Sequence, residues 1–304
     1  MKTYIGKSIV SLKKEPGGTE TVDEGLYGME AEVTGRQNGW LKLRMFYGYE
    51  GWAPEDEAVF RKTERTDGRK IRVVRASFAD VKAQPRVQAE TLLCVPRGAW
   101  LMSCGTWEEE WLQVQLLCGR CGYVPRTAVT ESVRETGEAF RRLPVPEQRK
   151  RLTETALSYL GTPYRWGGKT SLGVDCSGLA QMTYLLNGWI IYRDAQIKSG
   201  YPVRKIPLKD IQPGDLLYFS RPYGHLSGKP GLCSRHGGFR PPLCDGEQPE
   251  SRFPQVTGLI LPGASLGREV SMSEYFFQRK LPEAGNVCGR SLPPAVFQHK
   301  SAMV

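Results

Sequence analysis

The stretch GVDCSGLAQMTYLLNG, residues 173–188, places one cysteine where a short helix is expected to begin. After Cys176, the apolar residues Leu179, Met182 and Leu186 recur at helical spacing, and a glycine follows them as a stop signal. A thiol at a helix N-terminus meets the positive end of the helix dipole and unpaired backbone N–H groups, which lower its pKa. The same N–H groups can stabilise an oxyanion. The position therefore suits a nucleophile for acyl transfer, whereas the helix pattern alone favours a small buried thiol.

Two further patterns describe the elements on either side of this cysteine. Residues 145–161, VPEQRKRLTETALSYLG, carry apolar residues at helical spacing, with Pro146 near the start and Gly161 just past the end, which predicts a helix. Residues 203–219, VRKIPLKDIQPGDLLYF, contain a Pro-Gly-Asp turn that leads into an apolar run. This second pattern predicts the first strand of a sheet.

Several motifs in residues 151–219 carry a specific resemblance to a known family. The segment YLGTPYRWGGKTSLGVDCSGL, followed by RDA and LKDIQPGDLLYF, closely resembles the NlpC family of papain-like cysteine peptidases, which cut peptides of the bacterial cell wall. The resemblance implies a circularly permuted papain-like domain, in which a helix bearing the nucleophile packs on an antiparallel sheet. It also implies roles for four residues, namely Cys176 as the nucleophile, Asp175 and Ser177 as its substrate-contacting neighbours, and Tyr164 as a contributor near the oxyanion.

The resemblance extends to an acidic residue in the segment YRDA. Asp194 sits where related enzymes with two SH3-like modules hold the free N-terminal amine of the substrate. Coulomb attraction between a carboxylate and an ammonium in a partly desolvated cleft gives such selectivity a physical basis. A solvated loop acid or a helix cap is the alternative for this residue. The resemblance thus implies small peptides with a free N-terminal L-alanine as substrates.

The N-terminal half shows two similar all-β patterns. Short alternating apolar runs extend from Ile5 to about Ala58 and again from Ile71 to about Val129, which predicts small twisted antiparallel sheets. They form a weak internal repeat, in which Trp40, Leu41 and Leu43 precede Gly48, Tyr49 and Pro54, as Trp111, Leu112 and Val114 precede Gly122, Tyr123 and Pro125. This sequence pattern resembles that of bacterial SH3-like modules found beside cell-wall enzymes. Most of these aromatic side chains are expected to pack barrel cores, while an exposed one such as Tyr49 is a candidate ligand contact.

A cysteine peptidase also needs a histidine to take the thiol proton and a polar group to orient that histidine. The resemblance places both in strands after residue 219, but the chain there reads SRPYGHLSGKPGLCSRHGGFRPPLCDGEQPESRFPQ, which does not alternate. Residues 220–304 hold 10 of the 21 prolines, and proline is nearly excluded from central strands. We therefore expect an aberrant, poorly ordered tail and an unpaired sheet edge. His225 and His236 are the nearby candidates for the two histidine roles, and His299 is interpreted as a tail residue.

A frameshift is our hypothesis for this break in composition. Reverse translation of residues 222–239 with free wobble bases, shifted by one base, permits the string HMAIYLGNLDYVHATAG. This string has both histidines in the strand context that the family expects, although each codon junction allows several residues. A single-base shift near Ser220 would leave this chain without its proper base, and loss of activity is the consequence to test. The nucleotide sequence decides the matter, because the hypothesis requires a one-base change that restores a family-like strand pair.

Composition argues against several other classes of function. The formal net charge is +10, but Lys and Arg are scattered and no basic run is interleaved with aromatics, which argues against nucleic-acid binding. We find no membrane-spanning run and no signal-peptide-like run, so a cytoplasmic location is expected. Eight cysteines in such a chain favour reduced thiols. Cys118 and Cys121 form a lone C-x-x-C, which is interpreted as a turn between strands, and we expect no metal or other cofactor.

Together these patterns predict an α+β protein made of two small all-β SH3-like barrels and a papain-like helix-plus-sheet domain. The expected boundaries are 1–60 and 71–133 for the SH3-like domains, 145–219 for the N-terminal part of the NlpC-type domain and 220–304 for the tail, with a linker at 61–70. The predicted activity is hydrolysis of murein peptides between γ-D-glutamate and a diamino acid. A non-catalytic wall-binding or peptide-binding protein is the rival, and an amidase or acyl transferase using the same thiol is a third reading. The sequence does not indicate an oligomeric state.

Overall fold

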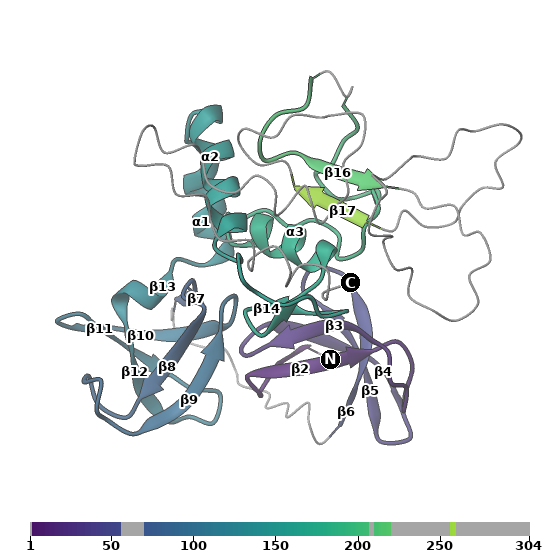
Figure 1. Cartoon of the computed structure of the whole chain (residues 1–304). Helices are drawn as coiled ribbons and strands as arrows, with labels where there is room; N and C mark the ends of the chain where they lie inside the picture. The colour runs from purple at the N-terminus through teal and green to yellow at the C-terminus, as the bar shows by residue number, and fades with distance from the viewer. Residues whose placement is uncertain (1, 56–69, 207–209, 220–255, 260–304) are drawn as a thin grey trace, which may run out of the picture.

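The computed structural model describes residues 2–55, 70–206, 210–219 and 256–259. Two β-sheets lie side by side, a layer of helices covers them, and a two-stranded sheet lies beyond the central helix (Figure 1). This arrangement confirms the predicted α+β class. Among the described residues, none of the helices is long and apolar enough to cross a membrane.

Six strands form the first sheet, which is antiparallel with the order β1-β4-β5-β6-β2-β3. Their bounds are β1 (Lys2–Tyr4), β2 (Ile9–Lys13), β3 (Thr21–Leu26), β4 (Glu30–Gln37), β5 (Trp40–Met45) and β6 (Glu50–Pro54). In β5 the side chains of Leu41, Leu43 and Met45 are buried, and the residues between them are more exposed. This period of two turns one apolar face of the sheet toward the core.

Seven strands form the second sheet, in the order β13-β7-β10-β11-β12-β8-β9. Their bounds are β7 (Ile71–Val74), β8 (Phe78–Lys82), β9 (Thr91–Pro96), β10 (Trp100–Glu108), β11 (Trp111–Gln115), β12 (Cys121–Pro125) and β13 (Val129–Thr130). A 3₁₀ turn at Arg126–Ala128 joins the last two strands. Cys118 lies in the tight turn between β11 and β12, as the sequence predicted for the C-x-x-C segment.

The internal repeat is real, but its alignment from the sequence was wrong in one part. In the first sheet, β5 and β6 pair Leu43 with Gly51, and in the second sheet β11 and β12 pair Val114 with Gly122. The structural equivalent of Gly122 is therefore Gly51, three residues beyond the predicted Gly48. The two hairpins have the same spacing, since Trp40 pairs with Pro54 as Trp111 pairs with Pro125. Matching the Gly-Tyr dipeptide at 48–49 to that at 122–123 therefore selected the wrong glycine, whereas the spacing itself points to Gly51.

Three helices follow the second sheet, and one of them was not predicted. The helices are α1 (Val133–Arg141), α2 (Val145–Leu157) and α3 (Cys176–Leu185), and a short hairpin of β14 (Lys169–Thr170) and β15 (Gly173–Val174) precedes α3. The missed helix α1 begins with a capping box. Ser132 accepts a hydrogen bond from the backbone N–H of Glu135, whose side chain accepts one in return from the N–H of Ser132. The sequence pattern S-x-x-E at residues 132–135 could have predicted the start of this helix.

The sheet beyond α3 extends further along the chain than predicted. Strand β16 (Leu216–Phe219) follows the Pro-Gly-Asp turn, as expected, and pairs antiparallel with β17 (Val256–Leu259). The expectation of an unpaired sheet edge after Phe219 is wrong, because β16 pairs with β17. The β-branched residues Val256 and Thr257 favour the second strand. The rest of the predicted tail lies outside the described residues.

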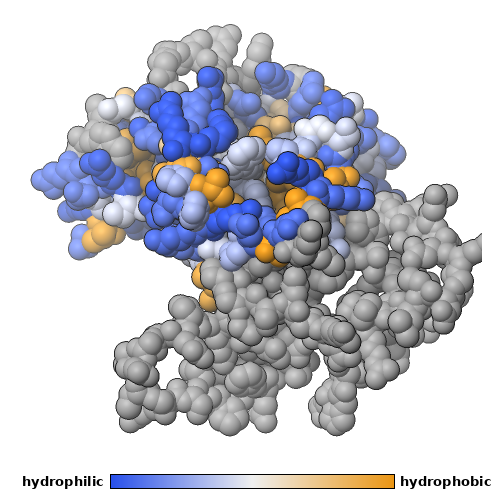
Figure 2. Space-filling view, turned by 90° about the horizontal axis from the view of Figure 1, so that it is seen from above, coloured by the Kyte–Doolittle hydropathy of each residue, from blue (hydrophilic) through white to orange (hydrophobic). Residues whose placement is uncertain are grey.

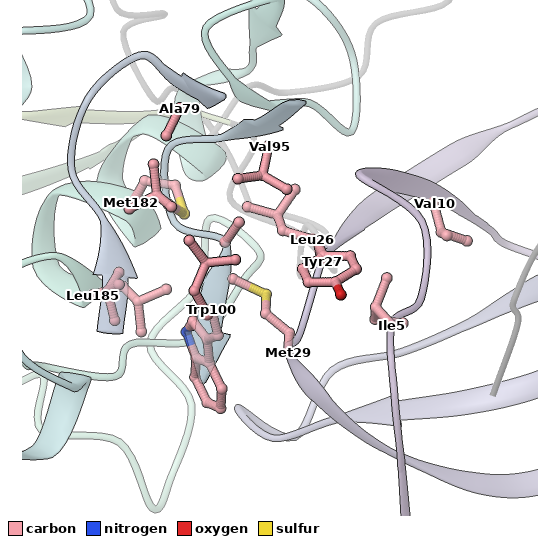
Figure 3. Close-up of a cluster of buried hydrophobic side chains, with 14 of the residues drawn as sticks. Ile5, Val10, Leu26, Tyr27, Met29, Ala79, Val95, Trp100, Met182 and Leu185 are labelled. Carbon is pink, nitrogen blue, oxygen red and sulfur yellow. The ribbon is translucent and has the colours of Figure 1, made fainter. Parts of the chain in front are cut away.

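One continuous hydrophobic core joins both sheets to α3. Figure 3 shows side chains from the first sheet, the second sheet and α3 converging on one another, namely Ile5, Val10, Leu26, Tyr27, Met29, Ala79, Val95, Trp100, Met182 and Leu185. Two glycines mark close approaches within this core. A Cβ on Gly28 would lie 2.0 Å from the carbonyl oxygen of Trp100, and a Cβ on Gly98 would lie 2.4 Å from Cε of Met182. The helix that begins at Cys176 is therefore packed tightly against both sheets.

The outer surface has a different character from this core. Seen from above, the described residues present mainly hydrophilic side chains, with small separate hydrophobic patches between them (Figure 2). Large exposed apolar side chains include Tyr164 and Trp166, which lie in the segment that leads to the β14–β15 hairpin. These two side chains are 55% and 62% exposed.

Candidate active site

The candidate nucleophile lies at the N-terminus of α3, as the sequence predicted. Cys176 is the first residue of the helix and is partly exposed, and Asp175 is its N-cap. The Asp175 Oδ1 atom accepts a hydrogen bond of 2.6 Å from the backbone N–H of Gly178. Such a cap satisfies one of the N–H groups that have no partner within the helix. The thiol thus sits where the helix dipole favours a negative charge.

The carboxylate of Asp175 is occupied by the protein itself. It accepts hydrogen bonds from the backbone N–H groups of Gly178 and Gly167, from Ser177 Oγ, and from Nη1 and Nη2 of Arg193. A carboxylate has about four acceptor positions, so these donors occupy it. The sequence predicted a substrate contact for Asp175, whereas the structure uses its side chain to cap and orient the nucleophile helix.

Ser177 is tied into the same network and remains partly exposed. Its Oγ accepts a hydrogen bond of 2.7 Å from Arg193 Nη1 and lies 3.2 Å from Asp175 Oδ1, to which it donates. A substrate contact through the exposed part of Ser177 stays a prediction.

Sequence reasoning missed the buried ionic cluster beneath the nucleophile helix. Arg193 binds both oxygens of Asp175 at 3.0 Å and places its Nε 2.8 Å from Oδ1 of Asp23, which belongs to β3 of the first sheet. Lys169 Nζ lies 2.8 Å from the same oxygen of Asp23 and donates a hydrogen bond of 2.5 Å to the hydroxyl of Tyr47. The hydroxyl of Tyr47 in turn donates to the other oxygen of Asp23. The side chains of Asp23, Lys169 and Arg193 are at most 1% exposed.

The electrostatics of this cluster follow from burial opposed by close opposite charges. Burial by itself would raise the pKa of Asp23, but Lys169 and Arg193 outweigh it and hold that pKa below its usual value. Burial lowers the pKa of Lys169 against the opposing effect of Asp23. Burial also works against the charge of Arg193, yet Asp175 and Asp23 together raise its pKa well above the usual value. The guanidinium therefore stays charged.

A second acidic residue of β3 flanks the cluster. Glu24 accepts a hydrogen bond of 2.9 Å from the backbone N–H of Lys169 and lies 3.7 Å from Nη1 of Arg165. Burial raises the pKa of Glu24, and the nearby donors only partly offset this effect. The acidic pair in the strand TVDEGL could have predicted buried charged partners, because a strand that faces a core rarely carries two adjacent buried acids.

The structure brings together two residues that the sequence singled out separately. Tyr49 follows β5 in the first sheet, and its hydroxyl donates a hydrogen bond of 2.9 Å to Oδ1 of Asp194. Burial raises the pKa of Asp194, partly offset by the hydrogen bond from Tyr49 and the charge of Arg193. Burial and the adjacent carboxylate also raise the pKa of Tyr49, which keeps its hydroxyl protonated as a donor. The pair lies next to the ionic cluster, because Arg193 and Asp194 are consecutive.

Tyr164 lies on the segment that passes beside the start of α3. Its backbone forms an isolated parallel bridge with Val174, two residues before Cys176, and its side chain is 55% exposed. This places the residue in the neighbourhood of the thiol. Its part at the oxyanion stays a prediction.

Comparison with known proteins identifies the family. The NlpC/P60 family model matches residues 161–228. Dipeptidyl-peptidase 6 of Lysinibacillus sphaericus is 36% identical over 237 residues, covering 75% of this chain and 83% of the relative. The chain belongs to the NlpC/P60 family. As a member it is a hydrolase, and by family a cysteine-type peptidase.

Two further similarities place this NlpC/P60 chain among known proteins. A γ-D-glutamyl-L-lysine dipeptidyl-peptidase of Bacillus subtilis is 40% identical over 93 residues, which cover 28% of this chain and 30% of the relative. The crystal structure of an NlpC/P60 family protein from Bacillus cereus superposes with a TM-score of 0.60 at 20% identity, covering 72% of this chain and 83% of the other. The latter similarity supports the fold, with its SH3-like sheets and its NlpC-type domain.

No histidine is among the residues that the structure describes. His225, His236 and His299 all lie outside the described residues, so their assignment stays a prediction. The thiols of Cys118 and Cys121 are both exposed and free. Within the described residues, no group of three or more His, Cys, Asp or Glu side chains is arranged to hold a metal ion.

Proposed function

We propose that this NlpC/P60 protein hydrolyses murein peptides at the bond between γ-D-glutamate and a diamino acid, and that it selects peptides with a free N-terminal L-alanine. The relative from Bacillus subtilis bears a name with the γ-D-glutamyl-L-lysine linkage, which supports this bond class. The observation that carries the proposal is the position of Asp194. This partly buried acid directly follows Arg193 in the sequence, and Arg193 binds the N-cap residue of the nucleophile helix.

The chemistry at the thiol follows from its place on α3. The thiolate of Cys176 attacks the γ-carbonyl carbon of D-glutamate, and the resulting oxyanion is stabilised by N–H groups at the helix N-terminus. Collapse of this intermediate breaks the C–N bond, and the amine of the diamino acid leaves with a proton donated by the general acid. Water then hydrolyses the thioester, which releases the γ-D-glutamyl carboxylate and restores the thiol. The histidine candidates for the proton transfers are His225 and His236.

Selection of a free amine follows from the pair of Tyr49 and Asp194. In its ionised form Asp194 attracts the ammonium group of L-alanine, and partial burial strengthens that attraction relative to water. The hydrogen bond from Tyr49 fixes the carboxylate and keeps one oxygen oriented. Since Tyr49 comes from the first sheet, an SH3-like sheet takes part in binding the peptide in this proposal.

A pair of substrates tests the proposal. L-Ala-γ-D-Glu-diaminopimelate and its N-acetyl derivative differ only at the N-terminus, where acetylation replaces the ammonium group by a neutral and slightly larger amide. We expect release of L-Ala-γ-D-Glu from the first and a kcat/KM at least about 100-fold lower for the second, because a buried ion pair lost from one side costs about 3 kcal/mol or more.

Three results would contradict this proposal. Equal cleavage of both peptides would show that Asp194 does not select a free N-terminal amine. Products other than L-Ala-γ-D-Glu and the diamino acid would indicate an amidase or a transferase. Binding of both peptides without turnover would favour the non-catalytic rival and direct attention to the nucleotide sequence near Ser220.

A further inference from the structure

The N-cap of the nucleophile helix presents an electrostatic conflict. Asp175 immediately precedes Cys176, and a carboxylate so close to a thiol opposes formation of the thiolate. Its hydrogen bonds to the N–H groups of Gly178 and Gly167 nevertheless hold the helix end and the preceding loop in place. A cap with this geometry is useful to a nucleophile only if its negative charge is neutralised.

Arg193 is placed to neutralise that charge. Its guanidinium binds the Asp175 carboxylate through two parallel hydrogen bonds of 3.0 Å, the bidentate geometry that gives the strongest pairing. It also donates at 2.7 Å to the hydroxyl of Ser177, on the other side of the thiol in the sequence. Both residues that flank Cys176 are therefore held by one side chain.

The guanidinium is itself held from the first sheet. Its Nε lies 2.8 Å from Asp23, and Asp23 is shared with Lys169, so acids and bases alternate along a buried chain from Asp175 through Arg193 and Asp23 to Lys169. In their ionised forms these four charges sum to zero. Removing one partner from such a set leaves an uncompensated buried charge, which fixes the position of Arg193 strongly.

We propose that Arg193 is a positioning residue for Cys176, which cancels the charge of the Asp175 cap and orients both neighbours of the thiol, with Asp23 of the first sheet holding it in place. The inference deepens the proposed function and rests on Cys176 being the nucleophile. Other titratable groups face the cluster from the elements packed around it, namely Glu24 from β3, Tyr47 and Tyr49 from the turn after β5, and Asp194 beside Arg193.

The rate of thiol alkylation tests this inference without requiring peptidase activity. The full chain is treated with iodoacetamide across a range of pH, and modification of Cys176 is followed by mass spectrometry of its tryptic peptide. In Arg193→Gln we expect the pH midpoint of alkylation to rise by about one unit, since the charge of Asp175 beside the thiol is then uncompensated and a nearby charge shifts a pKa by about 1–3 units. Arg193→Lys keeps the positive charge, so we expect its pH midpoint of alkylation to lie close to that of the unaltered chain.

Two further variants separate this role from a purely structural one. Arg97→Gln removes another buried guanidinium, which holds the backbone and hydroxyl of Ser158 and stacks on Tyr159, so it should lower stability while leaving the midpoint unchanged. Should Arg193→Gln fail to fold, Arg193→Gln combined with Asp23→Asn removes one charge of each sign and should still raise the midpoint.

The outcomes separate this inference from the proposed function. An unchanged midpoint in Arg193→Gln, or in its combination with Asp23→Asn, or an equal rise in Arg97→Gln, overturns the role of Arg193 whether or not the chain cleaves peptides. A raised midpoint supports that role even in a chain that shows no cleavage, in which case the failure belongs to the proposed function.

Discussion

At the scale of single residues, two acids on either side of Arg193 have different tasks, one as its hydrogen-bond partner and one as its neighbour in the sequence. Asp175 is saturated by protein donors and serves the helix, whereas Asp194 keeps one partner in Tyr49 and is partly exposed. The DCSG sequence identified Cys176 and its helix, because capping is a local property of consecutive residues. The same local pattern cannot tell whether the cap faces a substrate or a buried guanidinium.

A pH dependence follows from the raised pKa of Asp194. The ionised carboxylate binds the ammonium of the peptide, so KM for L-Ala-γ-D-Glu-diaminopimelate should rise as pH falls, and the rise should begin at a higher pH than for an ordinary aspartate. Steady-state kinetics across acidic pH measure this effect. In Asp194→Asn, KM should be high and flat over the same range, and an unaltered pH dependence of KM in that variant would exclude Asp194 as the titrating group.

At the scale of elements, local signals succeeded where a helix or strand is defined by its own residues. The strand β16 after its Pro-Gly-Asp turn and the helix α2 agree with the expected patterns. The capping box of Ser132 and Glu135 carried the same kind of signal for α1 and was overlooked. By contrast, the pairing of β16 with β17 joins residues about 40 positions apart, and spacing within either segment contains no information about it.

The close approach of the second sheet to α3 leads to a prediction about Gly98. Alanine there has a strained backbone, with φ of +90°, and its Cβ also meets the buried Met182. Gly119 is a matched control, since its φ is +89° and a Cβ would meet nothing within 4 Å. Urea unfolding should show that Gly98→Ala is less stable than Gly119→Ala by about 1–3 kcal/mol. Equal losses would mean that the packing of α3 on this sheet is looser than the structure indicates.

At the scale of the whole molecule, the first sheet and the peptidase domain form one unit. The core in Figure 3 is shared by both sheets and α3, and the ion pair between Asp23 and Arg193 spans 170 positions of the sequence. Family resemblance predicted the modules, but contacts at this separation depend on how the modules pack. A buried basic residue such as Lys169 has no distinguishing sequence feature, so the basic half of the cluster could not be predicted, whereas the adjacent acids of β3 were overlooked.

The buried cluster should therefore contribute more to stability than surface ion pairs do. Asp23→Asn removes the buried acid that Lys169 and Arg193 share and should lower the free energy of unfolding by about 3–5 kcal/mol. Glu20→Gln removes the exposed ion pair with Lys14 and should cost about 1 kcal/mol or less. Because the pKa of Asp23 is lowered by folding, its contribution is present above the ordinary aspartate pKa and is lost as pH falls through the folded value. Similar losses in both variants at neutral pH would contradict a stabilising role for the cluster.

Cys176 as the nucleophile is the assignment on which the proposed function depends most directly. The full chain and its Cys176→Ala variant, matched for folding by circular dichroism, are incubated with L-Ala-γ-D-Glu-diaminopimelate, and the products are identified by mass spectrometry. We predict that the unaltered chain releases L-Ala-γ-D-Glu and diaminopimelate and that Cys176→Ala releases neither. Absence of cleavage by the unaltered chain, or cleavage that survives the loss of Cys176, would contradict the account.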